Sequence, residues 1–161
     1  MNLRNKILFI LMAVLLFSCD KKRVFDEYKS VGTAWHKDSI IKFDLPVLDS
    51  VKPYNLYVNI RNNDKYEFSN LFLIVSLQHP KGFTKVDTLE YEMSDPEGNL
   101  LGEGFSDIKE SKLVYKQRNI FKPGGQYQVS IRQAVRQNGK VSGVEKLEGV
   151  SEVGFRIESI E

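Results

Sequence analysis

Apolar and polar side chains alternate with a period of two along most of the chain from about Trp35 onward, a pattern typical of β-strands with one buried face. Residues 54–61 (YNLYVNIR) show the alternation most clearly. Residues 71–77 (LFLIVSL) are apolar on both faces, which predicts a central strand covered on each side. Further alternating or short apolar runs lie at residues 86–93, 100–105, 113–115, 127–135 and 153–157.

Turn signals separate these runs, and no run has the spacing of an amphipathic helix. The sequences HPKG (79–82), DPEGN (95–99), KPGG (122–125) and NG (138–139) are rich in the residues that tight turns favour. About seven to nine short strands predict an all-β sandwich of two antiparallel sheets, immunoglobulin-like or jelly-roll, with a closed up-and-down barrel as the alternative. Gly154, inside the last run, predicts a close approach of backbones or a bulge.

The N-terminus has the pattern of an export signal. Residues 1–6 contain Arg4 and Lys6 and no acidic residue, and residues 7–17 (ILFILMAVLLF) are entirely apolar. A helix of that apolar length spans about 16 Å, roughly half of a bilayer core, so we do not expect a stable transmembrane anchor. A basic start, a short apolar core and a small residue before the cleavage site are typical of a secretory signal.

The sole cysteine of the chain follows this segment directly. Leu16-Phe17-Ser18-Cys19 resembles a bacterial lipobox, in which the cysteine is acylated and becomes the mature N-terminus. The alternatives are a plain signal peptide followed by a free thiol, or a short buried helix. Several acyl chains would anchor the protein stably in a membrane. We therefore expect a signal peptide at residues 1–18, a lipidated N-terminus and tether at 19–34, and a β-sandwich domain at 35–161.

Charge and composition narrow the function further. The 23 basic and 21 acidic side chains become 21 and 21 once Arg4 and Lys6 are removed with the signal, so no excess charge favours nucleic acid. Residues 20–23 (DKKR) are basic and would attract anionic lipid headgroups by about 1 kcal/mol per cation, unless they form only a solvated tether. A single cysteine excludes an internal disulfide and any multi-cysteine metal site.

The chain shows no pattern of catalytic or metal-binding residues. His36 and His79, its only histidines, have no second ligand at metal-binding spacing, and the motifs of nucleophile elbows and phosphate-binding loops do not occur in the required context. We expect no enzymatic activity, cofactor or metal. A hydrolase built around one of the histidines is the weakest of the hypotheses.

The candidates for a partner-binding surface are aromatic and basic. Trp35, Tyr57 and Phe72 would provide rings for a protein partner or a sugar, although core packing is the simpler interpretation of each. Arg132 and Arg136 lie four residues apart on one predicted strand face, where protection of a sheet edge is the alternative role.

Six segments in order after the lipobox resemble the GldH gliding-motility lipoprotein family of gliding bacteria of the Bacteroidetes type. They are Tyr54–Asn62, Phe68–Val75, Asp87–Met93, Gly98–Gly104, Ser111–Tyr115 and Val129–Glu158. The resemblance implies a non-enzymatic lipoprotein required for gliding motility, working with other envelope proteins of an apparatus linked to type IX secretion. The only functional residue that it implies is the acylated cysteine, at Cys19.

The resemblance and the residues together predict a lipid-anchored envelope protein that supports the motility apparatus through protein contacts. Its partners would be membrane lipid, through Cys19, and other motility proteins. The absence of an acidic run after Cys19 favours an outer-membrane position facing the periplasm. A glycan-binding β-sandwich lipoprotein is the alternative function.

Overall fold

A computed structural model describes residues 20–104 and 106–160 of the chain. Cys19 and the predicted signal peptide lie outside the described residues. Within them the chain forms strands and no helix, and therefore no helix that could span a membrane. The strands are β1 (Arg23–Ser30), β2 (Ala34–His36), β3 (Ile41–Asp44), β4 (Pro53–Asn62), β5 (Asn70–Gln78), β6 (Thr84–Glu92), β7 (Lys109–Ile120), β8 (Gln128–Gln133), β9 (Lys146–Glu148) and β10 (Val150–Ser159).

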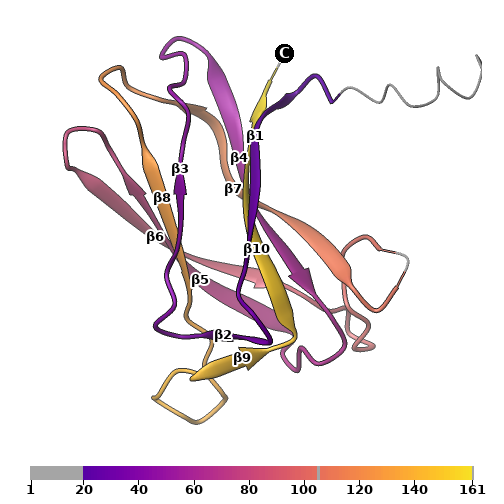
Figure 1. Ribbon diagram of the computed structural model, residues 1–161. Coiled ribbons are helices and arrows are strands. Elements are labelled where there is room, and N and C mark those ends of the chain that lie inside the picture. The colour runs from indigo at the N-terminus through magenta and orange to yellow at the C-terminus, as the bar shows by residue number, and fades with distance from the viewer. Residues whose placement is uncertain (1–19, 105, 161) are drawn as a thin grey trace, which may run out of the picture.

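Two antiparallel sheets face each other, which confirms the predicted sandwich. The first sheet has the strand order β1-β10-β4-β7 and the second has β3-β8-β5-β6. The short β2–β9 pair lies across one end of the sandwich, at the bottom of Figure 1. When β2 and β9 are set aside, the strand orders of the two sheets are those of a jelly roll, which decides between the two predicted sandwich types.

The core lies between the two sheets and follows the predicted alternation. Every second residue of β4 and β5 points inward and is buried, and Val153, Phe155 and Ile157 of β10 continue the pattern. The fully buried side chains of these three strands include Leu56, Val58, Ile60, Leu71, Leu73, Val75, Val153, Phe155 and Ile157. Burying each such side chain contributes about 1.5–3 kcal/mol, so these strands supply the main stabilisation of the sandwich.

The other face of β5 differs from the sequence-based expectation. Its residues Phe72 and Ile74 are half-buried on the outside of the second sheet, and no further sheet covers them. The prediction of a strand covered on both sides was therefore wrong. The apolar side chains on this outer face instead line a surface hollow, described below.

Two segments near the N-terminus also differ from expectation. Residues 23–30, assigned to the tether by the sequence analysis, pair with β10 from Arg23 opposite Glu158 to Ser30 opposite Glu152. Edge strands of this kind are polar, so their periodicity is weak. Trp35 of β2 is 0% exposed and its Nε1 donates to the carbonyl oxygen of Ser39 at 3.0 Å. The structure thus removes Trp35 from the predicted partner surface, because its indole completes the core.

Candidate functional site

The outer face of the second sheet has a hollow of about 540 Å³ above β5 and β6. Its floor consists of Phe72 and Ile74 of β5, Thr88 of β6 and Ala134, which follows β8. One wall is formed by residues 136–139, where the predicted Asn138-Gly139 turn places Gly139 at a positive φ of 78°. The segment then returns toward β8, and the Val144 amide donates to the carbonyl oxygen of Val135 at 2.8 Å. This hollow is apolar at its floor and polar at its rim.

A second hollow of about 230 Å³ adjoins the first and shares Ile74, Ala134 and Arg136 with it. Arg132 lies opposite Ile74 across the β5–β8 pairing and lines this second hollow. Both arginines are exposed, and neither forms an ion pair with a carboxylate in the described ranges. We call the two hollows together the outer groove. It brings Phe72, Arg132 and Arg136 of the sequence-based candidates to one place.

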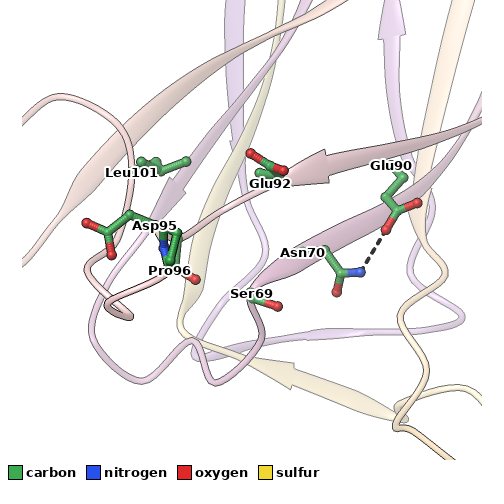
Figure 2. Close-up of a pocket in the computed structure, with 8 residues that line it drawn as sticks. Ser69, Asn70, Glu90, Glu92, Asp95, Pro96 and Leu101 are labelled. Atoms are coloured by element: carbon green, nitrogen blue, oxygen red, sulfur yellow. Dashed lines mark hydrogen bonds between the residues drawn. The ribbon is translucent and has the colours of Figure 1, made fainter.

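A third hollow, of about 510 Å³, lies at the end of the same sheet face, where β5 begins and β6 ends. Figure 2 shows the turn at Asp95 and Pro96 beside the start of β5, and the hydrogen bond of 2.8 Å that Asn70 donates to Glu90. Glu90, Glu92 and Asp95 make this hollow acidic. Asn99 donates two hydrogen bonds of 2.8 Å to Asp95, which holds the pKa of that carboxyl below its usual range. Asp95 therefore stabilises its own turn.

The outer groove and the acidic hollow both lie along β5, on the same face of the second sheet. Glu90 lies opposite Phe72, and Glu92 lies opposite Asn70, in the β5–β6 register. An apolar strip thus has carboxylates at one end and two arginines without ion-pair partners on its other side. This arrangement suits an extended protein segment with apolar and charged side chains, because apolar contacts supply affinity and the charges at the rim supply orientation.

The two histidines lie apart and contact no hydroxyl group. His36, in β2, lies 3.6 Å from carboxylate oxygens of both Asp38 and Glu145. His79, at the opposite end of the sandwich, packs against the rings of Phe83 and Tyr127, and burial and nearby lysines lower its pKa. Within the described residues, neither ring forms a hydrogen bond with a serine, threonine or tyrosine side chain, and no group of His, Cys, Asp and Glu has the arrangement of a metal site.

The outer face of the first sheet has a different character, because its charged side chains are bonded to one another. Arg61 donates to Glu110 at 2.8 Å and to Glu152 at 2.7 Å, and its guanidinium lies 4.1 Å from the centre of the Tyr28 ring. Tyr28 donates to Glu110 at 2.7 Å and accepts from Asn59 at 2.8 Å, and burial and Glu110 raise the pKa of its hydroxyl. These contacts connect β1, β4, β7 and β10 across the sheet.

A second part of this network surrounds Arg156. Arg156 donates to Asp26 of β1 at 2.7 Å, to Glu158 at 2.7 Å and to Asp20, the residue that follows Cys19. Tyr57 lies on the same face, with the Lys112 ammonium 4.2 Å from its ring centre. Tyr57 is therefore on the opposite side of the sandwich from Arg132 and Arg136, so the predicted partner residues do not form one surface. The sequence analysis did not identify Arg61 and Arg156, although their outward alternation places them on this face.

The fold and these surfaces define an all-β jelly-roll protein with a lipobox-type sequence before its first strand. A family model described as GldH lipoprotein matches residues 23–157. The gliding motility lipoprotein GldH of Flavobacterium johnsoniae is 65% identical over 158 residues, covering 98% of each chain. A homolog from Christiangramia forsetii is 54% identical over 151 residues, covering 94% of this chain and 93% of the relative. The chain belongs to the GldH lipoprotein family.

Solved structures give only distant similarity. The VP2 subviral particle of infectious bursal disease virus has a TM-score of 0.39 and 12% sequence identity, with 87% of this chain covered. The aligned part is 34% of the viral chain, so this protein spans about a third of its length.

Proposed function

We propose that this protein is a non-enzymatic, lipid-anchored component of the cell envelope that supports gliding motility by binding other proteins of the motility apparatus. Membership of the GldH lipoprotein family supports the lipid anchor and the link to motility. The anchor is the acylated Cys19, and the domain faces the periplasm from the outer membrane, beside the machinery linked to type IX secretion.

One observation determines where we place the protein contacts. The outer groove combines an exposed apolar floor at Phe72 and Ile74 with two arginines that have no ion-pair partner among the described residues. On the first sheet, by contrast, Arg61 and Arg156 are occupied by intramolecular carboxylates. The arginines of the groove are therefore available to a partner, and buried arginine contacts often dominate the affinity of protein interfaces.

The test is genetic complementation. Deletion of the gene should abolish spreading on agar without stopping growth, and the wild-type gene should restore it. The double variant Arg132→Glu with Arg136→Glu should restore little spreading, although it should accumulate and reach the membrane as the wild type does. The matched control reverses two exposed lysines that line neither hollow of the groove, Lys29→Glu in β1 with Lys65→Glu after β4, and should restore spreading fully.

The outcomes separate the parts of the proposal. Full spreading with the arginine variant would place the partner surface elsewhere. Normal spreading of the deletion strain would refute the role in motility itself. Unchanged membrane fractionation of a Cys19→Ala variant would refute the lipid anchor.

The glycan-binding alternative receives less support. It needs an exposed aromatic platform, but Trp35 is in the core, the Tyr57 ring is covered on one side by Lys112, and Phe72 is a single half-buried ring in the groove. Calorimetric titration with envelope polysaccharides should show no heat beyond that of dilution, and measurable affinity would favour this alternative.

A further inference from the structure

One end of the sandwich collects the start of the described chain and its C-terminal residues. Arg23 lies opposite Glu158, Tyr54 lies opposite Ser159, and Pro53 lies opposite Ile120. The loops at this end are residues 45–52, 79–83 and 121–127, which connect β3 to β4, β5 to β6 and β7 to β8. We call these loops, with residues 20–22, 84–85, 117–120 and 159–160 beside them, the anchor end; it lies at the top of Figure 1.

The loops of the anchor end are fixed to one another by packed rings. The His79 ring lies 5.1 Å from Phe83 and 4.8 Å from Tyr127, and Tyr127 lies 4.9 Å from Phe121. Tyr127 also accepts a hydrogen bond of 2.9 Å from the Lys122 amide. The Leu45 amide donates to the Tyr127 carbonyl oxygen at 2.8 Å, so the loop 45–52 is joined to the other two at its first residue.

The chain after Cys19 is bound to the sandwich almost immediately. Asp20 contacts Arg156, the Arg23 amide donates to the Asp20 carbonyl at 3.2 Å, and the Ser159 amide donates to the Lys22 carbonyl at 2.8 Å. The sequence analysis placed the domain at residue 35, beyond a long tether. Because Asp20 already contacts the domain, the tether after an acylated Cys19 would be only one residue long.

The anchor end has the composition of a surface that contacts lipid. Its exposed apolar side chains include Val47, Val51, Phe83 and Ile120, which are 77%, 82%, 63% and 59% exposed. In residues 45–52, 79–85 and 117–127 the cations are Lys52, Lys81, Lys85, Arg118 and Lys122. The described carboxylates of the anchor end are Asp49, which accepts a hydrogen bond from the Val51 amide at 2.9 Å, and Asp20, which is paired with Arg156.

The opposite end has the reverse charge. Residues 93–108 contain Asp95, Glu97, Glu103 and Asp107 and no lysine or arginine. Residues 63–69 contain two acidic side chains and one lysine, and residues 31–40 and 136–149, at the same end, together contain three acidic side chains and four basic ones, so the end as a whole is acidic. An anionic bilayer would therefore attract the anchor end and repel the far end, which orients the domain as well as holding it.

A hollow of about 350 Å³ at this surface has two cationic side chains in its lining. It is lined by Lys52, Pro53, Arg118, Ser159 and Ile160. Arg118 adopts a left-handed backbone with φ of 52°, at a bulge where the Asn55 side chain accepts a hydrogen bond from its amide at 3.0 Å. A non-glycine residue rarely adopts this conformation, and such strain is often retained at binding sites. Neither Lys52 nor Arg118 forms an ion pair with a described carboxylate, so both are free to bind a phosphate.

From these observations we propose that the anchor end docks on the surface of a membrane that contains anionic phospholipids. The exposed valines, Phe83 and Ile120 enter the interface, and Lys52 with Arg118 binds one lipid phosphate. This inference rests on the proposed lipid anchor at Cys19, because the anchor places this end against the bilayer.

The test uses the mature lipoprotein reconstituted into vesicles of phosphatidylethanolamine and phosphatidylglycerol. Acylation blocks the thiol of Cys19, so one introduced cysteine takes a polarity-sensitive fluorophore at a single site. The sites are Val51→Cys and Phe83→Cys at the anchor end and, as the control, Val141→Cys, which is 91% exposed near the far end. We expect a blue-shifted emission and several-fold weaker quenching by acrylamide at the two anchor-end sites than at the control site.

Charge variants test the phosphate contact. Lys52→Glu with Arg118→Glu should raise quenching at Val51→Cys toward the level of the control site, whereas Lys65→Glu with Lys146→Glu should leave the protection unchanged. Vesicles of phosphatidylcholine alone should also remove most of the protection.

Co-flotation with the vesicles separates the two proposals. Failure to co-float overturns both the lipid anchor and the docking. Co-flotation with equal quenching at the anchor-end and control sites overturns the docking alone. Protection that does not respond to charge reversal or to lipid composition overturns the binding of anionic phospholipid.

Discussion

Arg156 should be the most sensitive polar residue of the first sheet, because it joins β1, β10 and the residue after the anchor. Its side chain is 14% exposed and donates to Asp26 and Glu158, whose side chains are 17% and 11% exposed. Arg156→Met keeps the length and apolar contacts of the side chain but leaves these two carboxylates without its charge. The prediction is that this variant loses stability and that its edge strand β1 separates from β10.

The magnitude follows from the burial of the two carboxylates. Removing one partner of a buried ion pair costs about 3–5 kcal/mol, whereas an exposed pair contributes about 0–1 kcal/mol. Glu158 keeps a contact of 2.6 Å with Lys112, which reduces its share of the loss. We therefore expect the free energy of unfolding to fall by about 2–3 kcal/mol, and the melting temperature by about 5–10 °C for a chain of this length.

The assay is urea unfolding of the mature lipoprotein in a non-ionic detergent. Trp35, the only tryptophan, is fully buried and its fluorescence reports on global unfolding. The control is Arg132→Met, which removes an exposed arginine and should change stability by less than about 0.5 kcal/mol. Equal transitions for the two variants would refute the reasoning.

The same pair of proteins gives a pH dependence with a defined sign. Burial raises the pKa of Glu158, but hydrogen bonds from Lys112 and Arg156 outweigh it and hold the pKa below its ordinary value. The stabilisation by this pairing is therefore present above the unfolded pKa of about 4.3 and is lost as the pH falls through the lower folded pKa. The difference between the wild type and Arg156→Met should shrink below about pH 4, and a difference that grew there would contradict the assignment.

Two further substitutions test the packing that the structure shows. Trp35→Ala should lower the free energy of unfolding by about 3–5 kcal/mol, measured by circular dichroism during thermal unfolding, whereas a surface tryptophan would cost little. Gly154→Ala should cost about 1–3 kcal/mol in the same measurement, because its Cβ would lie 2.8 Å from two carbons of the Tyr28 ring. The control is Gly139→Ala, because nothing lies within 4 Å of a Cβ placed at Gly139, although the positive φ of this residue adds backbone strain. If Gly154→Ala lowers the free energy of unfolding no more than Gly139→Ala does, the contact with Tyr28 is unimportant.

Local periodicity was sufficient to predict the strands that form the core. The alternation at residues 54–61 became β4, and the apolar run at 71–77 became most of β5. A close approach does occur at Gly154, but the nearest atoms belong to the Tyr28 ring, a side chain, and the backbone oxygen of Glu27 comes only next, at 3.1 Å from a Cβ placed there. These features depend on residues close in sequence or on one face of a strand, where burial alone sets the pattern.

Features that depend on distant pairings were not predictable. The pairing of β1 with β10 joins residues about as far apart as the chain allows, and neither strand indicates its partner in its own sequence. The choice between an immunoglobulin-like and a jelly-roll strand order also depends on which distant strands pair. Trp35 was misplaced because β2 is only three residues long, too short for a period of two to show which face is buried.

The candidate site shows the same division. Arg132 and Arg136 were predicted to lie on one face of a single strand, but β8 ends at Gln133. Arg136 belongs to the segment that follows β8 and folds back, with Arg136 opposite Gly143, and this fold places it beside Arg132 in the same hollow. A spacing of four residues cannot reveal such a loop. Phe72 was a candidate because it is aromatic, and its value for binding became clear only when the outer face of β5 proved to be uncovered.

The two proposed surfaces constrain each other. If the anchor end rests on lipid, the strands lead away from the membrane, and a strand of ten residues such as β4 spans about 33 Å. The acidic hollow, at the start of β5 and the end of β6, then lies on the side of the domain far from the bilayer. The outer groove then lies between the acidic hollow and the bilayer, and it opens to the side of the domain rather than toward the membrane.

A partner in the groove would therefore be held at a fixed height and orientation above the lipid, which a long flexible tether would not provide. Strand β1 and the contact of Asp20 with Arg156 thus link the position of the anchor to the geometry of binding.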